Sequence, residues 1–192
     1  LKDLGADFLG ASTLYKYWPA VGNVHTYVHA VIELMKEQHL APRDIEAIRV
    51  YVGDFHQRMC QPLAMRRAPR TLVDAKFSLP FCVAIAAAKG RMGVSDFTAS
   101  GLEDPEVLAM AQRIEPIEDS RFDWKLELPS GVVDLVTRDG RRFTRVGDRV
   151  PGGPEAPLTW DQIARKFADC ASCAARTIAP ERIRKAQDFA HG

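Results

Sequence analysis

Residues 71–90 constrain the fold more than any other part of the chain, because a helix start, a largely apolar body and a helix stop follow one another there. Ser78 is a suitable N-cap, and Pro80 falls in the first turn, where its missing N–H costs nothing. Apolar residues and alanines then continue to Ala88, and Gly90 is typical of a helix C-terminus. The segment therefore predicts a helix that begins in a buried environment.

Two hydrophobic periods organise the first half of the chain. Apolar residues at the spacing of one helical face predict a helix over residues 23–38, capped by Asn23. Alternation predicts a half-buried strand over residues 45–52, whereas residues 54–70 follow neither period and are expected to be irregular to helical. Further helical segments are expected at residues 94–98, at 105–113 with Asp104 as cap, at 160–174 with Thr159 as cap, and from Pro180 onward.

Alternation returns in the second half. Residues 122–128, 132–138 and 141–146 predict an antiparallel meander with a two-residue turn at Asp139-Gly140, in which Trp124 and Leu126 face helices. Helices segregated around such a sheet make the fold class α+β. We expect a mainly antiparallel sheet of about four strands, with this C-terminal meander, packed with helices.

Composition narrows the function classes. The 26 basic and 25 acidic residues are interleaved and leave a formal charge of +1, so no nucleic acid or anionic membrane is an expected partner. The longest apolar run is far too short for a membrane span, and four cysteines without a leader-like start indicate reduced thiols and a cytoplasmic protein. With 46% hydrophobic residues, the 192-residue chain can bury a core and is expected to form a single domain over residues 1–192.

The loop before the expected helix at Asn23 is the best candidate site. Gly22 and Asn23 would present free backbone N–H groups at the positive end of the helix, which attracts carboxylates. Lys16 adds a mobile cation, and His25 in the first turn would be biased toward neutral imidazole, able to donate a hydrogen bond or accept a proton. We predict that Lys16 and His25 reach one solvent-accessible pocket. A capped surface helix with a solvated lysine is the alternative.

A local cluster of arginines adjoins the 71–90 segment. It comprises Arg58, Arg66, Arg67 and Arg70. Bidentate guanidinium recognition of a di- or tricarboxylate would suit such a cluster, with Arg66 and Arg70 as the substrate-binding candidates. A solvated face is the alternative interpretation.

Two patterns invite a metal hypothesis, and neither is sufficient. His25, His29 and Glu33 are four residues apart on one helix, but a catalytic zinc needs a further well-placed ligand. Cys170 and Cys173 lack a second pair or a nearby histidine, so we expect two small buried residues that bind no metal. Zinc retained through dialysis and lost in a Cys173→Ser variant would contradict this expectation.

Several segments together resemble the carboxy-terminal part of the MmgE/PrpD family, which includes 2-methylcitrate dehydratase and cis-aconitate decarboxylase. They are TLVDAKFSLPF at 71–81, Lys16-Tyr17-Trp18-Pro19 leading to Asn23-Val24-His25, and Pro-Leu-Thr-Trp at 157–160 followed by Lys166-Phe167. The resemblance implies that the loop brings Lys16 to the active site and that no cofactor is used. It also implies that a large helical domain precedes this region, with residues 1–22 as active-site-type loop and linker. We expect a homodimer in the full-length context.

Two positions depart from the family pattern. Many relatives have tyrosine where this chain has Phe81, and cis-aconitate decarboxylases have histidine where it has Val21. Both departures disfavour the decarboxylase activity.

We interpret the chain as the C-terminal domain of a lyase that abstracts a proton beside a carboxylate of a small di- or tricarboxylate, as a 2-methylcitrate dehydratase does. The principal base would lie in the helical domain, so we expect the chain alone to fold without turnover. Two alternatives remain open. One is a non-catalytic or truncated domain with a dimerisation or structural role, and the other is an epimerase or isomerase that begins with the same proton abstraction.

Overall fold

The computed structural model describes residues 5–6, 8, 10, 13–125 and 130–192. The chain forms two compact units. Residues 18–148 make up the larger one, the sheet unit, and residues 1–17 with 149–192 make up the smaller one, the hairpin unit. Each unit is described by itself.

Four strands of the sheet unit form one mixed sheet in the order β2-β1-β3-β4. The central strand β1 pairs antiparallel with β3 and parallel with β2, and β3 pairs antiparallel with β4. The strands are β1 (Ile45–Val52), β2 (Ile114–Glu118), β3 (Gly131–Thr137) and β4 (Arg142–Gly147). The α+β class is confirmed, but a mainly antiparallel sheet is wrong, because one edge of this sheet is parallel.

The parallel edge strand β2 is a strand that the sequence did not predict. Its five residues are too few for alternation to show clearly, and they include Pro116, which a strand tolerates at a sheet edge because one side needs no hydrogen-bond partner. The expected strand at 122–128 is not seen in its described part. Phe122 ends the 3-10 turn η5 (Ser120–Phe122), residues 123–125 form no regular element, and residues 126–128 lie outside the described residues.

The hairpin of β3 and β4 confirms the other two strands of the expected meander. Its loop is longer than a two-residue turn: the Gly140 N–H donates to the Thr137 carbonyl at 2.9 Å, and Gly140 adopts a φ of +86°. Such a glycine closes a hairpin loop of three or more residues. Trp124 packs against Phe55 of the short helix α2 (Asp54–Gln57), with ring centroids 5.2 Å apart, as expected, whereas Leu126 lies outside the described residues.

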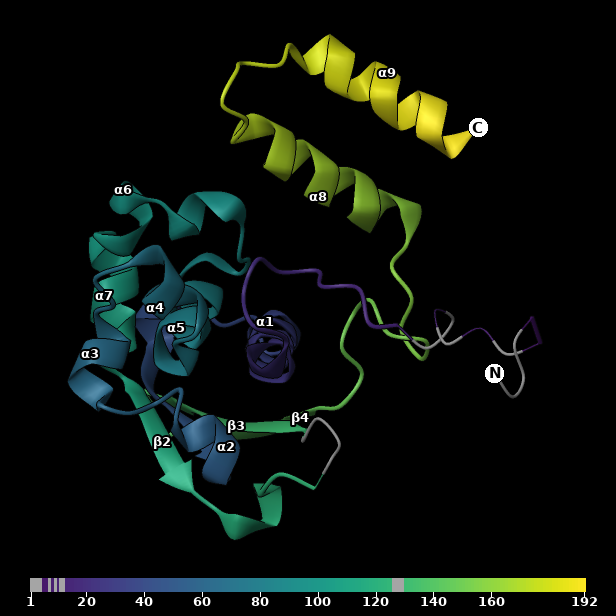
Figure 1. Cartoon of the computed structure of the whole chain (residues 1–192). Helices are drawn as coiled ribbons and strands as arrows, with labels where there is room; N and C mark the ends of the chain where they lie inside the picture. The colour runs from purple at the N-terminus through teal and green to yellow at the C-terminus, as the bar shows by residue number, and fades with distance from the viewer. Residues whose placement is uncertain (1–4, 7, 9, 11–12, 126–129) are drawn as a thin grey trace. The chain divides into compact units, whose positions relative to one another are not determined.

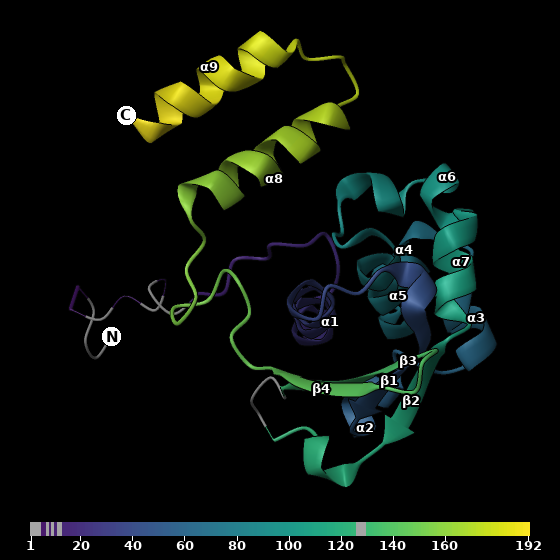
Figure 2. The same cartoon turned by 180° about the vertical axis from the view of Figure 1, so that it is seen from behind.

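The helix over residues 79–90 forms as predicted. In α5 (Leu79–Lys89), the Ser78 Oγ accepts a hydrogen bond from the Phe81 N–H at 3.1 Å, and Gly90 ends the helix with a φ of +62°. Residues 79–87 are all buried, as in a helix that is apolar on every side. Together with α1 (His25–Glu37), α5 covers one face of the sheet (Figure 1; from behind, Figure 2).

The remaining helices of the sheet unit are short, and α5 contacts several of them, most extensively α7. Asp104 caps α7 as expected, accepting from the N–H groups of Glu106 and Val107. These helices and 3-10 turns are η2 (Gly22–Val24), η3 (Pro42–Asp44), α3 (Leu63–Arg67), α4 (Leu72–Lys76), η4 (Val94–Phe97), α6 (Ala99–Leu102) and α7 (Pro105–Ala111).

Helix α1 approaches the sheet at backbone distance over a pair of glycines. Gly131 and Gly147 are register partners on β3 and β4. A Cβ at position 147 would lie 1.9 Å from the Thr26 carbonyl oxygen, and one at position 131 would lie 2.6 Å from the Tyr27 nitrogen. Only glycine at both positions therefore permits this helix–sheet spacing.

The hairpin unit contains α8 (Trp160–Ser172), predicted from its Thr159 cap, and α9 (Pro180–His191), predicted from Pro180 at its start. Thr159 and Gln162 form a capping box at the start of α8. The two helices contact each other through a hydrogen bond from Gln187 Nε2 to the Ala164 carbonyl at 2.7 Å and through stacked rings of Trp160 and His191. None of the helices in the described part of the chain has the length and apolar character that crossing a membrane requires.

Gly147→Ala should lower the free energy of unfolding of the sheet unit by about 3 kcal/mol, because the new methyl group would overlap the Thr26 main chain and force α1 away from the sheet. Urea denaturation followed by circular dichroism measures this change. Gly22→Ala is the matched control, since no atom lies within 4 Å of its added Cβ. Equal stability of the two variants would show that α1 does not depend on the close approach.

Candidate functional site

Lys16 lies in the hairpin unit, on the rim of a cleft of about 540 Å³. The cleft is bounded by residues 13–16, the loop at 152–158 and the first turns of α8. Lys16 is exposed and Lys166 is half-buried, and most other lining side chains are apolar. No acidic side chain is among the described residues that line it. The cleft suits a ligand that combines negative charge with apolar groups.

His25 belongs to the sheet unit, where it is the first residue of α1 and completely buried. Its ring packs edge-on against the Trp18 indole, with centroids 5.3 Å apart. Because Lys16 and His25 belong to different units, each described by itself, their meeting in one pocket stays a prediction.

Asn23 does not cap α1, so that part of the prediction is wrong. The 3-10 turn η2 precedes the helix, and the N–H groups of Val24 and His25 donate to the carbonyls of Val21 and Gly22. The carbonyls of this turn accept the hydrogen bonds that a capping side chain would otherwise accept from the first N–H groups of the helix. The N-cap position falls on Val24. Substrate binding by Gly22 and Asn23 stays a prediction.

His56 on α2 supports the start of α1, and sequence reasoning missed it. Its Nε2 lies 3.2 Å from the Asn23 carbonyl oxygen, to which it donates as the neutral tautomer protonated at Nε2. The ring is buried against Tyr27 and Phe55, and its Nδ1 has no hydrogen-bond partner among the described residues. Burial lowers the His56 pKa despite the nearby Asn23 carbonyl and Asp54 carboxylate. A lone histidine in an irregular segment offers no pattern from which this role could be predicted.

The two segments that carry the family resemblance in the sheet unit meet through their main chains. The Val21 N–H donates to the Lys76 carbonyl at 3.0 Å, which joins the loop before α1 to the turn before α5. The Lys76 ammonium lies over the Phe97 ring, 5.8 Å from its centroid. Phe81 is completely buried in α5. The 71–81 segment therefore supports the loop structurally, and its Lys76 side chain lies against an aromatic ring.

Two of the clustered arginines bind main-chain oxygens. Arg66 donates to the carbonyls of Gln61 and Arg58 at 3.1 and 3.2 Å, and its own carbonyl accepts from the Ser78 hydroxyl. Arg67 donates to the Ile114 carbonyl at 2.6 Å. The Arg66 guanidinium thus holds the chain before the 71–81 segment, the Arg67 guanidinium holds the start of β2, and substrate binding by Arg66 stays a prediction.

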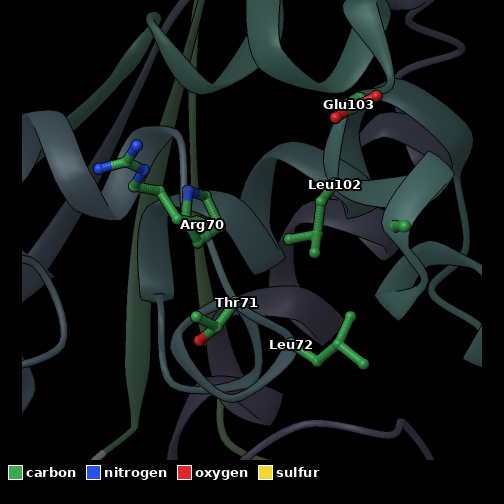
Figure 3. Close-up of a pocket in the computed structure, with 7 residues that line it drawn as sticks. Arg70, Thr71, Leu72, Leu102 and Glu103 are labelled. Atoms are coloured by element: carbon green, nitrogen blue, oxygen red, sulfur yellow. The ribbon is translucent and has the colours of Figure 1, made fainter.

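Arg70 is exposed and lines a pocket of about 600 Å³ in the sheet unit. Thr71 and Leu72 come from the same segment, and Leu102 and Glu103 form the opposite side (Figure 3). In this view the Arg70 guanidinium points away from Glu103. Arg70 is thus accessible to a carboxylate, but the Glu103 carboxylate lines the same pocket, and substrate binding by Arg70 stays a prediction.

Metal ligands do not gather in the described part of the chain: no three His, Cys, Asp or Glu side chains there lie close enough to hold an ion. Cys170 and Cys173 are exposed in the last turn of α8, so the expectation that they are buried is wrong. A short helical hairpin has too little core to cover both faces of its helices. That Cys170 and Cys173 bind no metal stays a prediction.

Comparison with known families gives one match. The model of the MmgE/PrpD C-terminal domain matches residues 18–190, which cover the whole sheet unit and nearly all of the two C-terminal helices. A search of curated proteins found no match.

Acidification should destabilise the sheet unit through His56. Because the folded-state pKa lies below the unfolded value of about 6.5, the unfolded chain binds more protons, and stability is lost as pH falls from about 6.5 through the folded pKa. His56→Gln keeps a donor toward Asn23 and cannot titrate, so its free energy of unfolding should depend less on pH. Urea titrations between pH 5 and 8 measure the slope.

The matched control is His39→Asn, at an exposed histidine with a φ of +52° that asparagine tolerates. This variant should keep the wild-type slope. An unchanged slope in His56→Gln would contradict the assignment.

Proposed function

The chain belongs to the MmgE/PrpD family, and from this premise we propose that it is the C-terminal domain of a lyase acting on a small di- or tricarboxylate. The reaction is dehydration of the 2-methylcitrate dehydratase type. The carrying observation is that Lys16, the residue that the resemblance assigns to the active site, lies exposed on the rim of a cleft that also holds Lys166 and no described acidic residue.

The chemistry requires positive charge where negative charge develops. Removal of a proton beside a carboxylate produces an enolate-like dianion, and loss of hydroxide from the neighbouring carbon then forms the double bond. Ammonium groups held near the reacting centre stabilise the dianion more than the substrate and so lower the barrier. In this proposal Lys16 supplies that charge, and the principal base comes from the helical domain that the resemblance places before this region.

Residues of the sheet unit complete the proposal. His25 acts as hydrogen-bond donor or proton shuttle, Gly22 and Asn23 bind a carboxylate, and Arg66 or Arg70 anchors a distal carboxylate. Exposure of Arg70 supports its candidacy most, because Arg66 already donates to main-chain carbonyls. We further propose a homodimeric, cytoplasmic protein that uses no cofactor.

The isolated chain should not turn over 2-methylcitrate, whereas the same chain joined to a helical domain of the family should. One lysine and one histidine can polarise a substrate, but the reaction also needs a base held against the acidic C–H and a cavity without water. NMR of the product measures turnover. In the joined protein, Lys16→Ala should lower kcat by about a hundredfold or more.

Lys36→Ala, at an exposed lysine of α1, is the control and should keep wild-type turnover. Turnover by the isolated chain that Lys16→Ala abolishes would show that the site is already complete. A joined, folded protein that acts on no tricarboxylate would refute the proposed function itself.

A further inference from the structure

A lysine of the C-terminal hairpin holds the main chain next to Lys16. Lys166 lies on α8, and its Nζ donates a hydrogen bond to the Tyr17 carbonyl at 3.0 Å. The side chain is half-buried, so its ammonium is less free to exchange this contact for water than that of an exposed lysine. Tyr17 follows Lys16 directly, so the contact holds the main chain on the C-terminal side of Lys16.

A second anchor holds the other end. The Tyr15 N–H donates to the Gly152 carbonyl at 2.9 Å. Gly152 has a φ of +106°, and a Cβ there would lie 2.1 Å from the Tyr15 carbonyl oxygen, so only glycine permits the approach. The glycine loop is itself closed by a hydrogen bond from the Gly152 N–H to the Ala156 carbonyl at 2.8 Å.

Lys16 therefore stands between two anchored residues within one unit, and a charged side chain, that of Lys166, anchors the residue on its C-terminal side. An exposed lysine has a flexible four-carbon stem, so the direction of its ammonium is limited mainly by how firmly its own main chain is held. A displacement of about 1 Å in a catalytic group can cost about a hundredfold in rate.

We propose that Lys166 is a positioning residue for Lys16: through the Tyr17 carbonyl it fixes the backbone from which the Lys16 ammonium reaches into the cleft. The inference rests on the proposed function for its catalytic consequence. Its structural part, the anchoring of residues 15–17, stands independently of any reaction.

Hydrogen exchange of the Tyr15 amide tests the anchoring directly, because that amide is bonded to Gly152 and is released when the segment loosens. Lys166→Ala should accelerate its exchange about tenfold or more, while amides within α8 stay protected. Lys166→Arg should restore slow exchange, since a guanidinium can donate to the same carbonyl. Arg165→Ala, at an exposed residue of the same helix, should change nothing.

Unchanged Tyr15 exchange in a folded Lys166→Ala variant would overturn the proposal. If α8 unfolds in the alanine variant, Lys166→Met replaces it in the exchange experiment, because methionine keeps most of the aliphatic stem without the ammonium group. Loss of α8 protection in the methionine variant as well would show that Lys166 stabilises its own helix, and this also overturns the proposal.

Kinetics separate positioning from substrate binding in the protein joined to a helical domain. Lys166→Ala should lower kcat between about tenfold and a hundredfold with KM nearly unchanged, and Lys166→Arg should recover most of it. A raised KM with unchanged kcat would mean that Lys166 binds substrate and would overturn positioning. Accelerated Tyr15 exchange in a protein without any turnover would refute the proposed function and leave the anchoring intact.

Discussion

The spacing between α1 and the β3–β4 hairpin is the constraint on which the sheet unit depends. Two facing glycines let the helix main chain touch the strands, and the Thr26 hydroxyl is buried there without a hydrogen-bond partner among the described residues. Because α1 lies so close to the strands, the residues on either side of Thr26 are also buried. His25 is buried against Trp18, and Tyr27 reaches the Tyr51 carbonyl with its hydroxyl at 2.7 Å.

Main-chain oxygens organise the candidate site more than side-chain pairs do. Arg67, His56 and Lys166 each donate to a carbonyl of a segment distant in sequence. Arg66 donates to the nearby carbonyls of Gln61 and Arg58. A basic residue that binds the backbone is thereby less available to a substrate. Arg66 and Arg67, which donate to main-chain carbonyls, differ in this respect from Arg70, which is exposed.

Local chemistry was predictable from the sequence, and non-local pairing was not. The caps at Ser78, Asp104 and Thr159 formed as expected, because each depends on a side chain and N–H groups two or three residues away. The strand β2 depends instead on β1, whose Ile48 pairs with Ile114 from 66 residues earlier in the chain, and the five residues of β2 contain a proline. Asn23 failed as a cap because a 3-10 turn competed for the same helix start.

In the candidate site, too, local features could be predicted from the sequence and contacts between distant segments could not. The family resemblance assigned Lys16 to the active site, and a pocket shared with His25 stays a prediction. Lys166 and Gly152, which bond the residues on either side of Lys16, lie more than a hundred residues later in the chain. The anchoring role of Lys166 depends on a carbonyl, which every residue possesses. No residue pattern in the Lys16 segment could therefore indicate it.

The hydrogen bond between Val21 and Lys76 has a consequence for divergence within the family. It uses no side-chain atom, so any residue except proline at position 21 keeps the donor, and any residue at position 76 keeps the acceptor. A histidine at position 21, as cis-aconitate decarboxylases have, is compatible with the same main-chain path. Substitutions at these two positions can therefore change the side chains while this contact between the two segments is kept.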